Sequence, residues 1–300
     1  MENILSQVGI IGAGELGKAL GNALTKSHLQ VLYYDRDPTR TTTGSIEDLV
    51  RICQILLVCV PSWAVNDVAK QLRKAAHPHE PRVVVTCAKG VEPGFVTMDQ
   101  VLRDKLPEHY DIGVMYGPMI AGEIERSRPS YAVLALSNRK WFSVFYDHFA
   151  AANLYLEYSA DTHGVALASV LKNVYAIGFG LIDGLGLGLN AKGKMVVLVL
   201  AEVKRMLSDM HAQPLTAEGL AGLGDLLATG FSEESFNYRI GKSLAERIAD
   251  EHIKSEGLVT LHELQKNVDL SRYPVAQAIY KIVFRYADPH VLADVLTGRH

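Results

Sequence analysis

The chain has 300 residues, of which 48% are hydrophobic and 21% charged, and its formal net charge is -3. This composition is typical of a soluble globular protein long enough for two domains, and the near-neutral charge gives no indication of a nucleic-acid or membrane partner. The three cysteines, Cys53, Cys59 and Cys87, are not spaced as metal ligands, so we expect no metal site and a reduced protein.

No segment of the sequence is expected to direct the chain to a membrane. Its first residues lack the basic and apolar regions of a signal peptide. The longest apolar stretch is interrupted by Lys172, Asn173 and Asp183, which argues against a membrane span. We therefore expect a cytoplasmic protein.

Residues 1–160 alternate short apolar runs with helical segments, which is the pattern of a Rossmann-type domain. The run at residues 55–60 is apolar on both faces, as in a strand that is buried in a parallel sheet. We therefore expect an α/β fold with a doubly wound parallel sheet in this half. The expected strands cover residues 8–11, 30–34, 55–60, 82–86, 112–115, 131–136 and 154–158, with helices at residues 16–26, 64–75 and 140–150.

A glycine pattern follows the first expected strand directly. Residues 12–17 read G-x-G-x-x-G and lead into the helix expected at residues 16–26. In this context the pattern predicts a dinucleotide site, because its glycines permit a tight turn and let the backbone approach a pyrophosphate at the helix N-terminus. The alternative is a glycine-rich turn without a ligand. The residues expected at the cofactor here are Gly12, Gly14, Glu15, Leu16 and Gly17.

The second expected strand ends at Asp35, which lies 18 residues after Gly17. An acidic residue at this place accepts hydrogen bonds from the adenosine ribose and favours NAD. Arg36 follows it and could instead meet the 2′-phosphate of NADP, while Asp35 could simply begin the turn before Asp37. We therefore predict NAD as the cofactor, with NADP as the open alternative.

Two further expected strands end in residues that are placed to bind a ligand. Pro61 follows the run at residues 55–60, and Lys89 lies just past the strand at residues 82–86. Ligands bind at the carboxyl ends of the strands in open α/β sheets, so we expect both residues at the cofactor. A solvated loop lysine is the alternative for Lys89.

Residues 161–300 show no further strand pattern and are expected to form an all-helical domain. A Rossmann-type domain followed by a helical domain predicts a cleft between the two, and we expect the active site there. The helical segments are expected at residues 162–183, 192–211 and 216–224, and around residues 242–253, 259–266 and 275–286.

Lys172 and Asn173 lie in a strongly hydrophobic stretch, within the helix expected at residues 162–183. A buried ammonium is costly unless it is paired, and burial lowers the pKa of a lysine toward neutrality, which suits proton transfer. The alternative is a lysine whose ammonium extends from a core helix to solvent. The cofactor pattern upstream favours a catalytic Lys172.

Two motifs of the second half are highly specific. Residues 219–226 read Gly-Leu-Ala-Gly-Leu-Gly-Asp-Leu, and Leu-Lys-Asn-Val at residues 171–174 precedes Asp-Gly-Leu-Gly-Leu-Gly at residues 183–188. On these segments the chain resembles the NAD(P)-dependent glycerol-3-phosphate dehydrogenases, and the resemblance covers nearly its full length. Further matching segments are residues 12–14, 88–92, 117–118, 190–192 and 256–257.

The resemblance implies a reaction and the residues that carry it. The implied reaction is hydride transfer between nicotinamide C4 and C2 of dihydroxyacetone phosphate or glycerol 3-phosphate, in a homodimer. Lys172 is implied to be the general acid and base. Asp225, Lys89 and Asn173 are implied to complete the catalytic group, and Lys89, Ala121 and Glu256 to lie at the cofactor. The expected substrate residues are Lys89, Gly117, Met119, Lys172, Asp225, Ser235, Phe236, Asn237 and Arg239.

The chain departs from the family pattern on the side that holds the substrate phosphate. Phe236 stands where the family has the arginine of a Ser-Arg-Asn motif, and a phenyl ring neither neutralises nor hydrogen-bonds a phosphate. Met119 replaces a polar residue, Tyr116 stands where serine is frequent, and Leu189 stands where aspartate is usual. The cofactor half and the acid/base lysine are retained.

Several interpretations of this departure stay open. Arg239, one helical turn from Phe236, or Lys192 could hold the phosphate instead. The enzyme could also reduce a different small carbonyl compound, or the chain could be a non-catalytic NAD sensor. The β-hydroxyacid dehydrogenases share the two-domain plan but place an asparagine four residues after the catalytic lysine, where this chain has Ala176.

Overall fold

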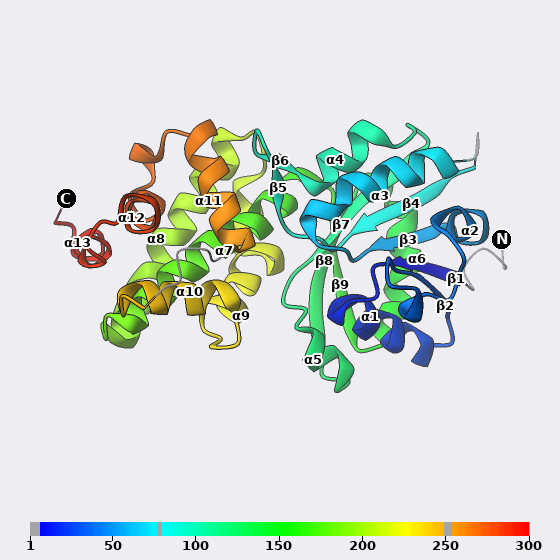
Figure 1. The fold of residues 1–300 in the computed structure, drawn as a ribbon, viewed down its shortest axis with the longest axis horizontal. Helices are drawn as coiled ribbons and strands as arrows, with labels where there is room; N and C mark the ends of the chain where they lie inside the picture. The colour runs from blue at the N-terminus through cyan, green and yellow to red at the C-terminus, as the bar shows by residue number, and fades with distance from the viewer. Residues whose placement is uncertain (1–6, 77–79, 249–253, 300) are drawn as a thin grey trace. The chain divides into compact units, whose positions relative to one another are not determined.

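The computed structural model of the chain describes residues 7–76, 80–248 and 254–299, and the chain divides into two compact units (Figure 1). Unit 1 comprises Met1–Lys89 and Thr97–Ala166, and unit 2 comprises Gly90–Val96 and Leu167–His300. The assignment of Gly90–Val96 to the second unit is a feature that no pattern in the sequence indicates.

Unit 1 is built on a seven-stranded sheet with the order β2-β1-β3-β4-β7-β8-β9. All seven expected strands are present, and the predicted fold class is confirmed. Helices α1 and α6 pack together on one face of the sheet, and α3 and α4 pack on the other (Figure 1). The strands are β1 (Gln7–Ile11), β2 (Gln30–Tyr34), β3 (Ile55–Val58), β4 (Arg82–Thr86), β7 (Tyr110–Tyr116), β8 (Ser130–Leu136) and β9 (Leu154–Ser159). The helices are α1 (Glu15–Lys26), α2 (Ile46–Ile52), α3 (Ser62–Ala75), α4 (Met98–Lys105), α5 (Ala121–Glu125) and α6 (Arg139–Ala151).

The central strands explain where a ligand can bind. Every residue of β3 and β4 is buried, and the two strands pair in parallel from Ile55 opposite Val83 to Val58 opposite Thr86. β1 lies between β2 and β3, so the strand order reverses at its carboxyl end. In doubly wound sheets a ligand binds at this reversal, which is where the glycine pattern of residues 12–17 stands.

One strand pairing differs from the wholly parallel sheet that the sequence predicts. β8 runs antiparallel to β7, with Met115 opposite Leu134, and β9 is parallel to β8. The connection from β7 to β8 contains only the five-residue helix α5, which spans about 7.5 Å, whereas a seven-residue strand spans about 23 Å. Because this helix is too short to run back along the sheet, β8 returns in the opposite direction.

A short hairpin carries the segment that joins unit 2. It consists of β5 (Val91–Glu92) and β6 (Val96–Thr97), and Gly94 takes a positive φ of 86° in its turn. The Gly94 N–H donates to the Glu263 carboxylate at 3.0 Å, which ties the turn to a helix of unit 2. The hairpin was not expected, because two-residue strands leave no periodic signal.

Unit 2 contains no strand outside this hairpin in the part of the chain that the structure describes, as expected. The predicted second helix begins at Gly188 instead of residue 192. The helix predicted around residues 242–253 is wrong at its start, because the Ser235 side chain caps a helix that begins at Phe236; residues 249–253 lie outside the described residues. The helices are α7 (Thr162–Gly184), α8 (Gly188–Asp209), α9 (Asp225–Gly230), α10 (Phe236–Ala245), α11 (Glu256–Asn267), α12 (Pro274–Arg285) and α13 (His290–Thr297).

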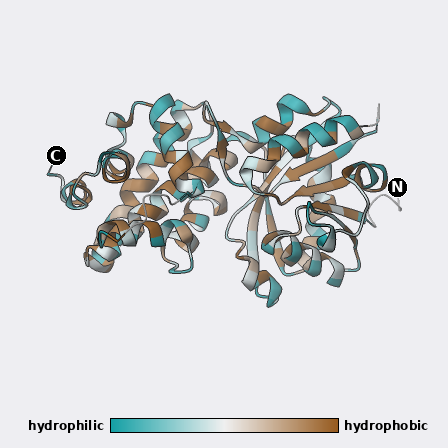
Figure 2. Cartoon of the chain, in the orientation of Figure 1, coloured by the Kyte–Doolittle hydropathy of each residue, from teal (hydrophilic) through white to brown (hydrophobic). Residues whose placement is uncertain are grey.

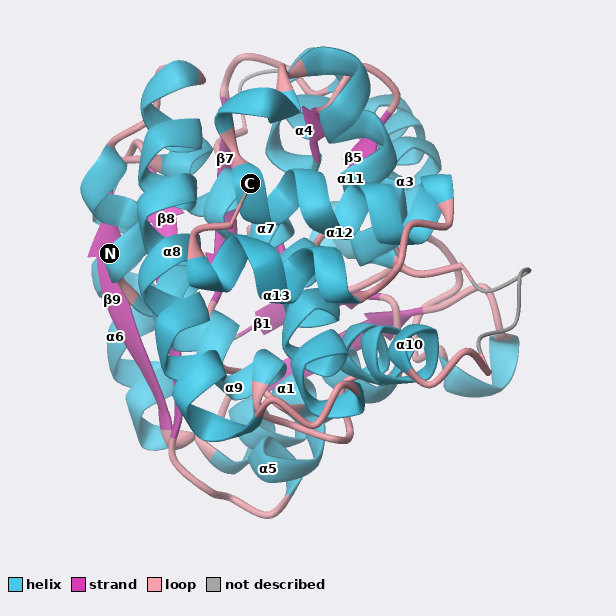
Figure 3. Ribbon diagram, turned by 90° about the vertical axis from the view of Figure 1, so that its left-hand side faces the viewer, coloured by secondary structure: helices cyan, strands magenta, loops and turns pink. Residues whose placement is uncertain are grey.

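Helix α7 forms the core of unit 2. It has the length and hydropathy of a membrane span, but its most apolar stretch is wholly buried inside the protein, as in a core helix. Hydrophobic residues follow α7 along its length (Figure 2), and α8, α12 and α13 are neighbours in the surrounding layer (Figure 3). A Cβ on Gly241 of α10 would lie 1.8 Å from the Ile177 carbonyl oxygen of α7. This close approach holds the middle of α10 against the C-terminal half of α7.

Candidate active site

The glycine loop after β1 is shaped by contacts with the neighbouring strand. Gly12 has a φ of 100°, and a Cβ there would lie 2.8 Å from the carbonyl carbon of Cys59. A Cβ on Gly17 would lie 1.9 Å from the Gly12 carbonyl oxygen. Only glycine fits these two positions, so both serve the tight turn that the sequence predicts.

Gly14 stands apart from the other two glycines of the loop. A Cβ on Gly14 would meet no protein atom within 4 Å, so the space above it is open. Gly14 is the N-cap of α1, and no side chain caps this helix. The N–H groups at Glu15 and Leu16 therefore point toward open space with the positive end of the helix dipole, which fits a pyrophosphate.

Asp35, just past the end of β2, holds the glycine loop from the neighbouring strand. Its carboxylate accepts from the Ala13 N–H at 2.7 Å and from the Asp37 N–H at 2.9 Å, so it serves as the turn residue that was one of its predicted roles. A carboxylate can accept further hydrogen bonds, which leaves capacity for a ribose. The Arg36 guanidinium lies 6.0 Å from the ring centre of Trp63, an exposed residue that the sequence analysis did not single out.

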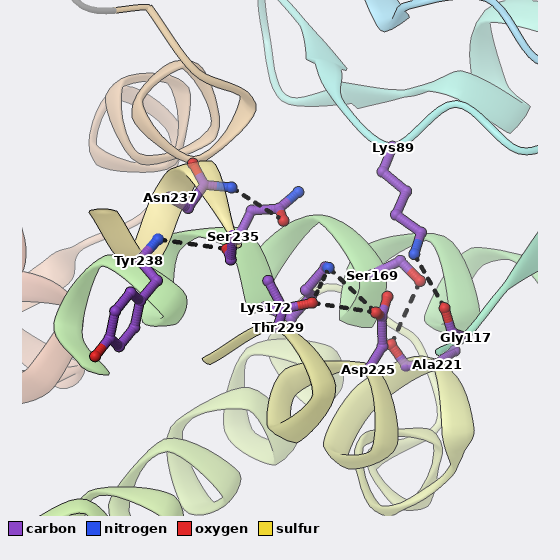
Figure 4. Close-up of polar contacts among 11 residues, drawn as sticks. Lys89, Gly117, Ser169, Lys172, Ala221, Asp225, Thr229, Ser235, Asn237 and Tyr238 are labelled. Carbon is purple, nitrogen blue, oxygen red and sulfur yellow. Dashed lines mark hydrogen bonds and ion pairs between the residues drawn. The ribbon is translucent and has the colours of Figure 1, made fainter. Parts of the chain in front are cut away.

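Lys89 is held near the carboxyl ends of β4 and β7. Its ammonium donates to the Gly117 carbonyl at 3.3 Å (Figure 4). The same ammonium lies 5.8 Å from the Tyr116 ring centre. The Tyr116 hydroxyl donates to the Ala88 carbonyl at 2.6 Å, so this tyrosine positions the lysine loop. Gly117 is obligatory, because a Cβ there would lie 2.6 Å from the Tyr131 carbonyl oxygen.

The remaining predicted residues of unit 1 lie at the starts of helices or beside them. Pro61 is the N-cap of α3, and Ala121 is the first residue of α5. Met119 is partly buried and packs against the core of the unit, and its N–H donates to the Gly117 carbonyl at 2.9 Å. Their roles at the cofactor and the substrate stay predictions.

Lys172 is the centre of a buried polar cluster in unit 2. Its ammonium donates to the Asp225 carboxylate at 3.1 Å and to the Thr229 hydroxyl at 2.6 Å (Figure 4). Lys172 is 7% exposed and Asp225 is 3% exposed, so the lysine does not extend to bulk solvent. The carboxylate and the hydroxyl offset the cost of burying the ammonium.

Thr229 is the one member of this cluster that the sequence analysis missed. It lies four residues after Asp225 on α9, and the two side chains share one face of the helix. Its hydroxyl donates to the Asp225 carboxylate at 3.4 Å, so the two acceptors are themselves connected. The i, i+4 spacing from a suspected active-site aspartate was the signal that could have identified it.

A second polar chain links three helices of unit 2. The Asn237 amide donates to Asn173 at 3.3 Å, and its carbonyl accepts from the Gly257 N–H at 3.2 Å. Asn173 and Asn237 are both nearly fully buried. This chain fixes the start of α10 and the start of α11, where Glu256 is the first residue, relative to the helix that carries Lys172.

The N-terminus of α10 presents the residues that depart from the family pattern. Ser235 caps the helix and accepts from the Tyr238 N–H at 3.4 Å (Figure 4). Phe236 is 48% exposed, and the Arg239 guanidinium lies 5.8 Å from the centre of its ring. Arg239 is itself exposed, so a cation stands one turn from the position where the family has its arginine.

Lys192 is less suited to bind a phosphate. Its ammonium donates to the Asp183 carboxylate at 2.5 Å and lies 5.1 Å from the Phe231 ring centre. Asp183 also accepts from the Tyr238 hydroxyl, and although burial opposes its ionisation, these two hydrogen bonds lower the pKa of Asp183. Lys192 is therefore neutralised by an ionised partner.

These features define a class of protein. A doubly wound unit that offers uncapped N–H groups to a pyrophosphate, and a helical unit with a buried, paired lysine, are the parts of a two-domain nicotinamide-dependent dehydrogenase. The parts lie in different units, so the predicted cleft between them stays a prediction.

The comparisons with known proteins name the family. Residues 39–142 match the model for the N-terminus of the NAD-dependent glycerol-3-phosphate dehydrogenases, and residues 161–294 match the model for their C-terminus. The chain belongs to this family, whose members are oxidoreductases that use NAD or NADP.

Relatives and solved structures agree with this assignment. The chain is 31% identical to a glycerol-3-phosphate dehydrogenase [NAD(P)+] of Acinetobacter baylyi, over 97% of this chain and 89% of that protein. It is 30% identical to a protein of the same name in Desulfitobacterium hafniense, over 98% and 92% of the two chains. The structure of glycerol-3-phosphate dehydrogenase from Coxiella burnetii has a similar fold, with a TM-score of 0.86, 23% identity and coverage of 98% and 99%.

Proposed function

We propose that the protein catalyses the reversible reduction of dihydroxyacetone phosphate to sn-glycerol 3-phosphate with NADH or NADPH. Family membership supports the reaction class, and the relatives named above support the substrate. The observation that carries the chemistry is the buried ammonium of Lys172, held by Asp225 and Thr229. A site with this proton donor suits the reduction of a carbonyl to an alcohol.

The residues of the chain perform the proton part of the reaction. When bound, the nicotinamide supplies the hydride. Negative charge then develops on the carbonyl oxygen at C2, and the Lys172 ammonium stabilises that charge and donates a proton to it. Asp225 supplies the countercharge of the ammonium, and Thr229 fixes its direction. In the oxidation of the alcohol, the neutral lysine accepts the proton.

The phosphate of the substrate needs a cation on α10. We assign this role to Arg239, because its guanidinium is exposed and supported by the Phe236 ring, whereas Lys192 is bound to Asp183. The N-terminal end of the α10 helix dipole adds to the positive potential at this position. Asn237 contributes by fixing the start of α10.

The proposed function is tested by steady-state kinetics with dihydroxyacetone phosphate and either NADH or NADPH. The wild type should reduce dihydroxyacetone phosphate, and Lys172→Ala should lower kcat at least about a hundredfold while the Kd for NADH is unchanged. Absence of turnover by the wild type would refute the proposal that the protein is an enzyme of this kind. Faster reduction of unphosphorylated dihydroxyacetone would refute the assigned substrate but leave the hydride chemistry intact.

We further propose that the enzyme acts as a homodimer in the cytoplasm, without nucleic-acid or membrane partners. Exposed apolar residues on α8, Leu189 at 75% and Val197 at 63%, support a contact between two copies. Three free cysteines support a reducing compartment. Light scattering should give about twice the chain mass of 32.9 kDa, and a single-chain mass would contradict the dimer.

A further inference from the structure

Cys59 and Cys87 form a pair of thiols at the carboxyl ends of β3 and β4. The two strands pair in parallel up to Val58 opposite Thr86, and the cysteines are the next residues on each strand. Neighbouring strands lie about 4.8 Å apart, which is within the Cα separation of about 4.4–6.8 Å that a disulfide requires. The Cα atoms of the two cysteines therefore lie within the range of a disulfide, and their Cβ atoms must move closer, to about 3.5–4.5 Å, for the bond to form.

The two thiols also contact each other. A hydrogen bond with Cys87, together with burial, raises the pKa of Cys59 well above its usual range. Cys59 is partly exposed and Cys87 is buried, so a small reagent can reach the pair whereas a large one is excluded.

Cys59 also packs against the dinucleotide loop of residues 12–17. Its carbonyl carbon lies 2.8 Å from the position of a Cβ on Gly12, and its Cβ lies 3.3 Å from that of a Cβ on Gly17. Its N–H donates to the Ile11 carbonyl at 2.8 Å. Because β3 lies between β1 and β4, a pull on Cys59 toward Cys87 moves it away from this loop.

We propose that Cys59 and Cys87 form a reversible disulfide that weakens the binding of the dinucleotide at residues 12–17. Hydrogen peroxide oxidises one of the two thiols to a sulfenic acid and is reduced to one water. The sulfur of the other cysteine attacks the sulfenic sulfur with loss of its proton, forms the S–S bond and releases the second water, so two electrons leave the sulfurs and reduce the peroxide. A dithiol reverses the change by reducing the bond to two thiols and becoming a disulfide itself.

The disulfide and the binding of NADH are thermodynamically linked, so each must weaken the other by the same factor. The S–S bond, at about 2.05 Å, draws Cys59 toward Cys87, and we expect the Kd for NADH to rise about tenfold, because small displacements of a ligand-holding loop have effects of this size or larger. NADH must then disfavour the disulfide by the same factor. For a two-electron couple, a tenfold factor corresponds to a reduction potential that is about 30 mV higher when NADH is saturating.

The test treats the intact protein with hydrogen peroxide and follows two independent signals. Peptide mapping should show a disulfide between Cys59 and Cys87 and a mass loss of about 2 Da, and titration should show the weaker binding of NADH. Dithiothreitol should restore both. The disulfide is detected without any ligand, so its failure is distinguishable from a failure of the proposed cofactor site, which the NADH affinity of the reduced protein reports.

Two variants complete the design. Cys87→Ala should keep its NADH affinity after peroxide, and Cys53→Ala should respond as the wild type, because Cys53 lies at the end of α2 and is fully buried. The proposal is overturned if both thiols survive peroxide, if the disulfide links another pair, or if the Cys59–Cys87 bond forms and NADH binds as before. It is also overturned if peroxide weakens binding equally in Cys87→Ala.

Discussion

At the scale of single residues, the chemistry depends on how a charge is kept inside a helix. An ammonium at 7% exposure is costly, and Lys172 is tolerated because Asp225 supplies a countercharge and Thr229 a second acceptor. The composition around Lys172 predicted burial, and a specific motif predicted Asp225. Thr229 was not predicted: its i, i+4 spacing from Asp225 places it beside that aspartate, but its contact with Lys172 comes from a helix 57 residues away in the sequence.

Removing the Thr229 hydroxyl should slow the reaction without unfolding the protein. We expect Thr229→Val to lower kcat about 10- to 100-fold with an unchanged Kd for NADH, because Lys172 loses the group that directs its ammonium. Thr229→Ser restores a hydroxyl at the same place and should recover most of the rate. Equal kcat values for the valine variant and the wild type would show that Asp225 alone positions the lysine.

Arg239 should affect the binding of the substrate and not the rate at which the bound substrate is converted. We expect Arg239→Ala to raise the KM for dihydroxyacetone phosphate about tenfold or more with little change in kcat, because the phosphate is remote from the reacting carbon. Arg247→Ala is the matched control, since Arg247 is exposed and pairs with Asp288 at 3.3 Å. An unchanged KM for Arg239→Ala would remove this residue from the phosphate site.

At the scale of elements, loops and helix ends carry the function. Gly12 and Gly14 differ by two positions, yet the first is fixed by a positive φ and by Cys59, while the second faces open space. The sequence pattern predicted the loop correctly because its spacing reflects local geometry. The sequence pattern could not show that Gly12 is required by the fold whereas Gly14 is required by the ligand. The contact that distinguishes the two glycines is with Cys59, the residue after β3.

A pair of glycine variants tests this difference. Gly14→Val should leave the free energy of unfolding nearly unchanged and weaken NADH binding strongly, because its side chain occupies space that only the ligand uses. Gly12→Ala should lower the free energy of unfolding by about 1–3 kcal/mol, since the residue is held at a positive φ against Cys59. Urea unfolding and NADH titration check both, and a stability loss at Gly14 would contradict the assignment.

The start of α12 is capped by a distant helix. Glu202 of α8 accepts from the N–H groups of Val275 at 2.6 Å and Ala276 at 3.1 Å, and from the Tyr175 hydroxyl at 2.9 Å. Burial raises the pKa of Glu202 even though the two N–H groups favour its ionised form. Sequence patterns cannot show this cap, because the acceptor is about 70 residues from the helix it serves.

Glu202→Gln should lower the free energy of unfolding by about 1–3 kcal/mol, because an amide offers one acceptor where a carboxylate offers two. The folded pKa lies above the unfolded value of about 4.3, so the protonation of Glu202 stabilises the fold fully below that value, and this contribution is lost as the pH rises through the folded pKa. The stability difference between wild type and variant should therefore grow as the pH falls from 7 toward about 4.3. Glu218→Gln, at an exposed ion pair with Lys204, should show no such trend.

At the scale of the whole molecule, the seven strands of unit 1 and the helical character of unit 2 were predictable from local periodicity. The antiparallel entry of β8 and the assignment of Gly90–Val96 to unit 2 were not. The first depends on the reach of a five-residue helix. The second depends on Val91 and Phe95, which are buried in the core of unit 2, together with the hydrogen bond from Gly94 to Glu263. Each is a long-range consequence of packing that no window of sequence contains.

The residues proposed to bind the substrate phosphate could likewise not be assigned from the sequence alone. Phe236 was recognised as a departure from the family, but its consequence depends on neighbours that only the fold brings together. Arg239 lies over the Phe236 ring, whereas Lys192 is bound to Asp183, and these contacts separate two candidates that the sequence left equal. The sequence shows both cations, but it does not show which of them is free of an acidic partner and can bind a phosphate.

The central claim is that this chain transfers a hydride to C2 of dihydroxyacetone phosphate while Lys172 supplies the proton. The most direct test incubates the wild type with dihydroxyacetone phosphate and NADH that carries deuterium at both C4 positions, and then examines the product by nuclear magnetic resonance. We predict sn-glycerol 3-phosphate with one deuterium on C2, formed at least about a hundredfold more slowly by Lys172→Ala under the same conditions. Consumption of NADH without glycerol 3-phosphate, or a product without deuterium at C2, would contradict the claim.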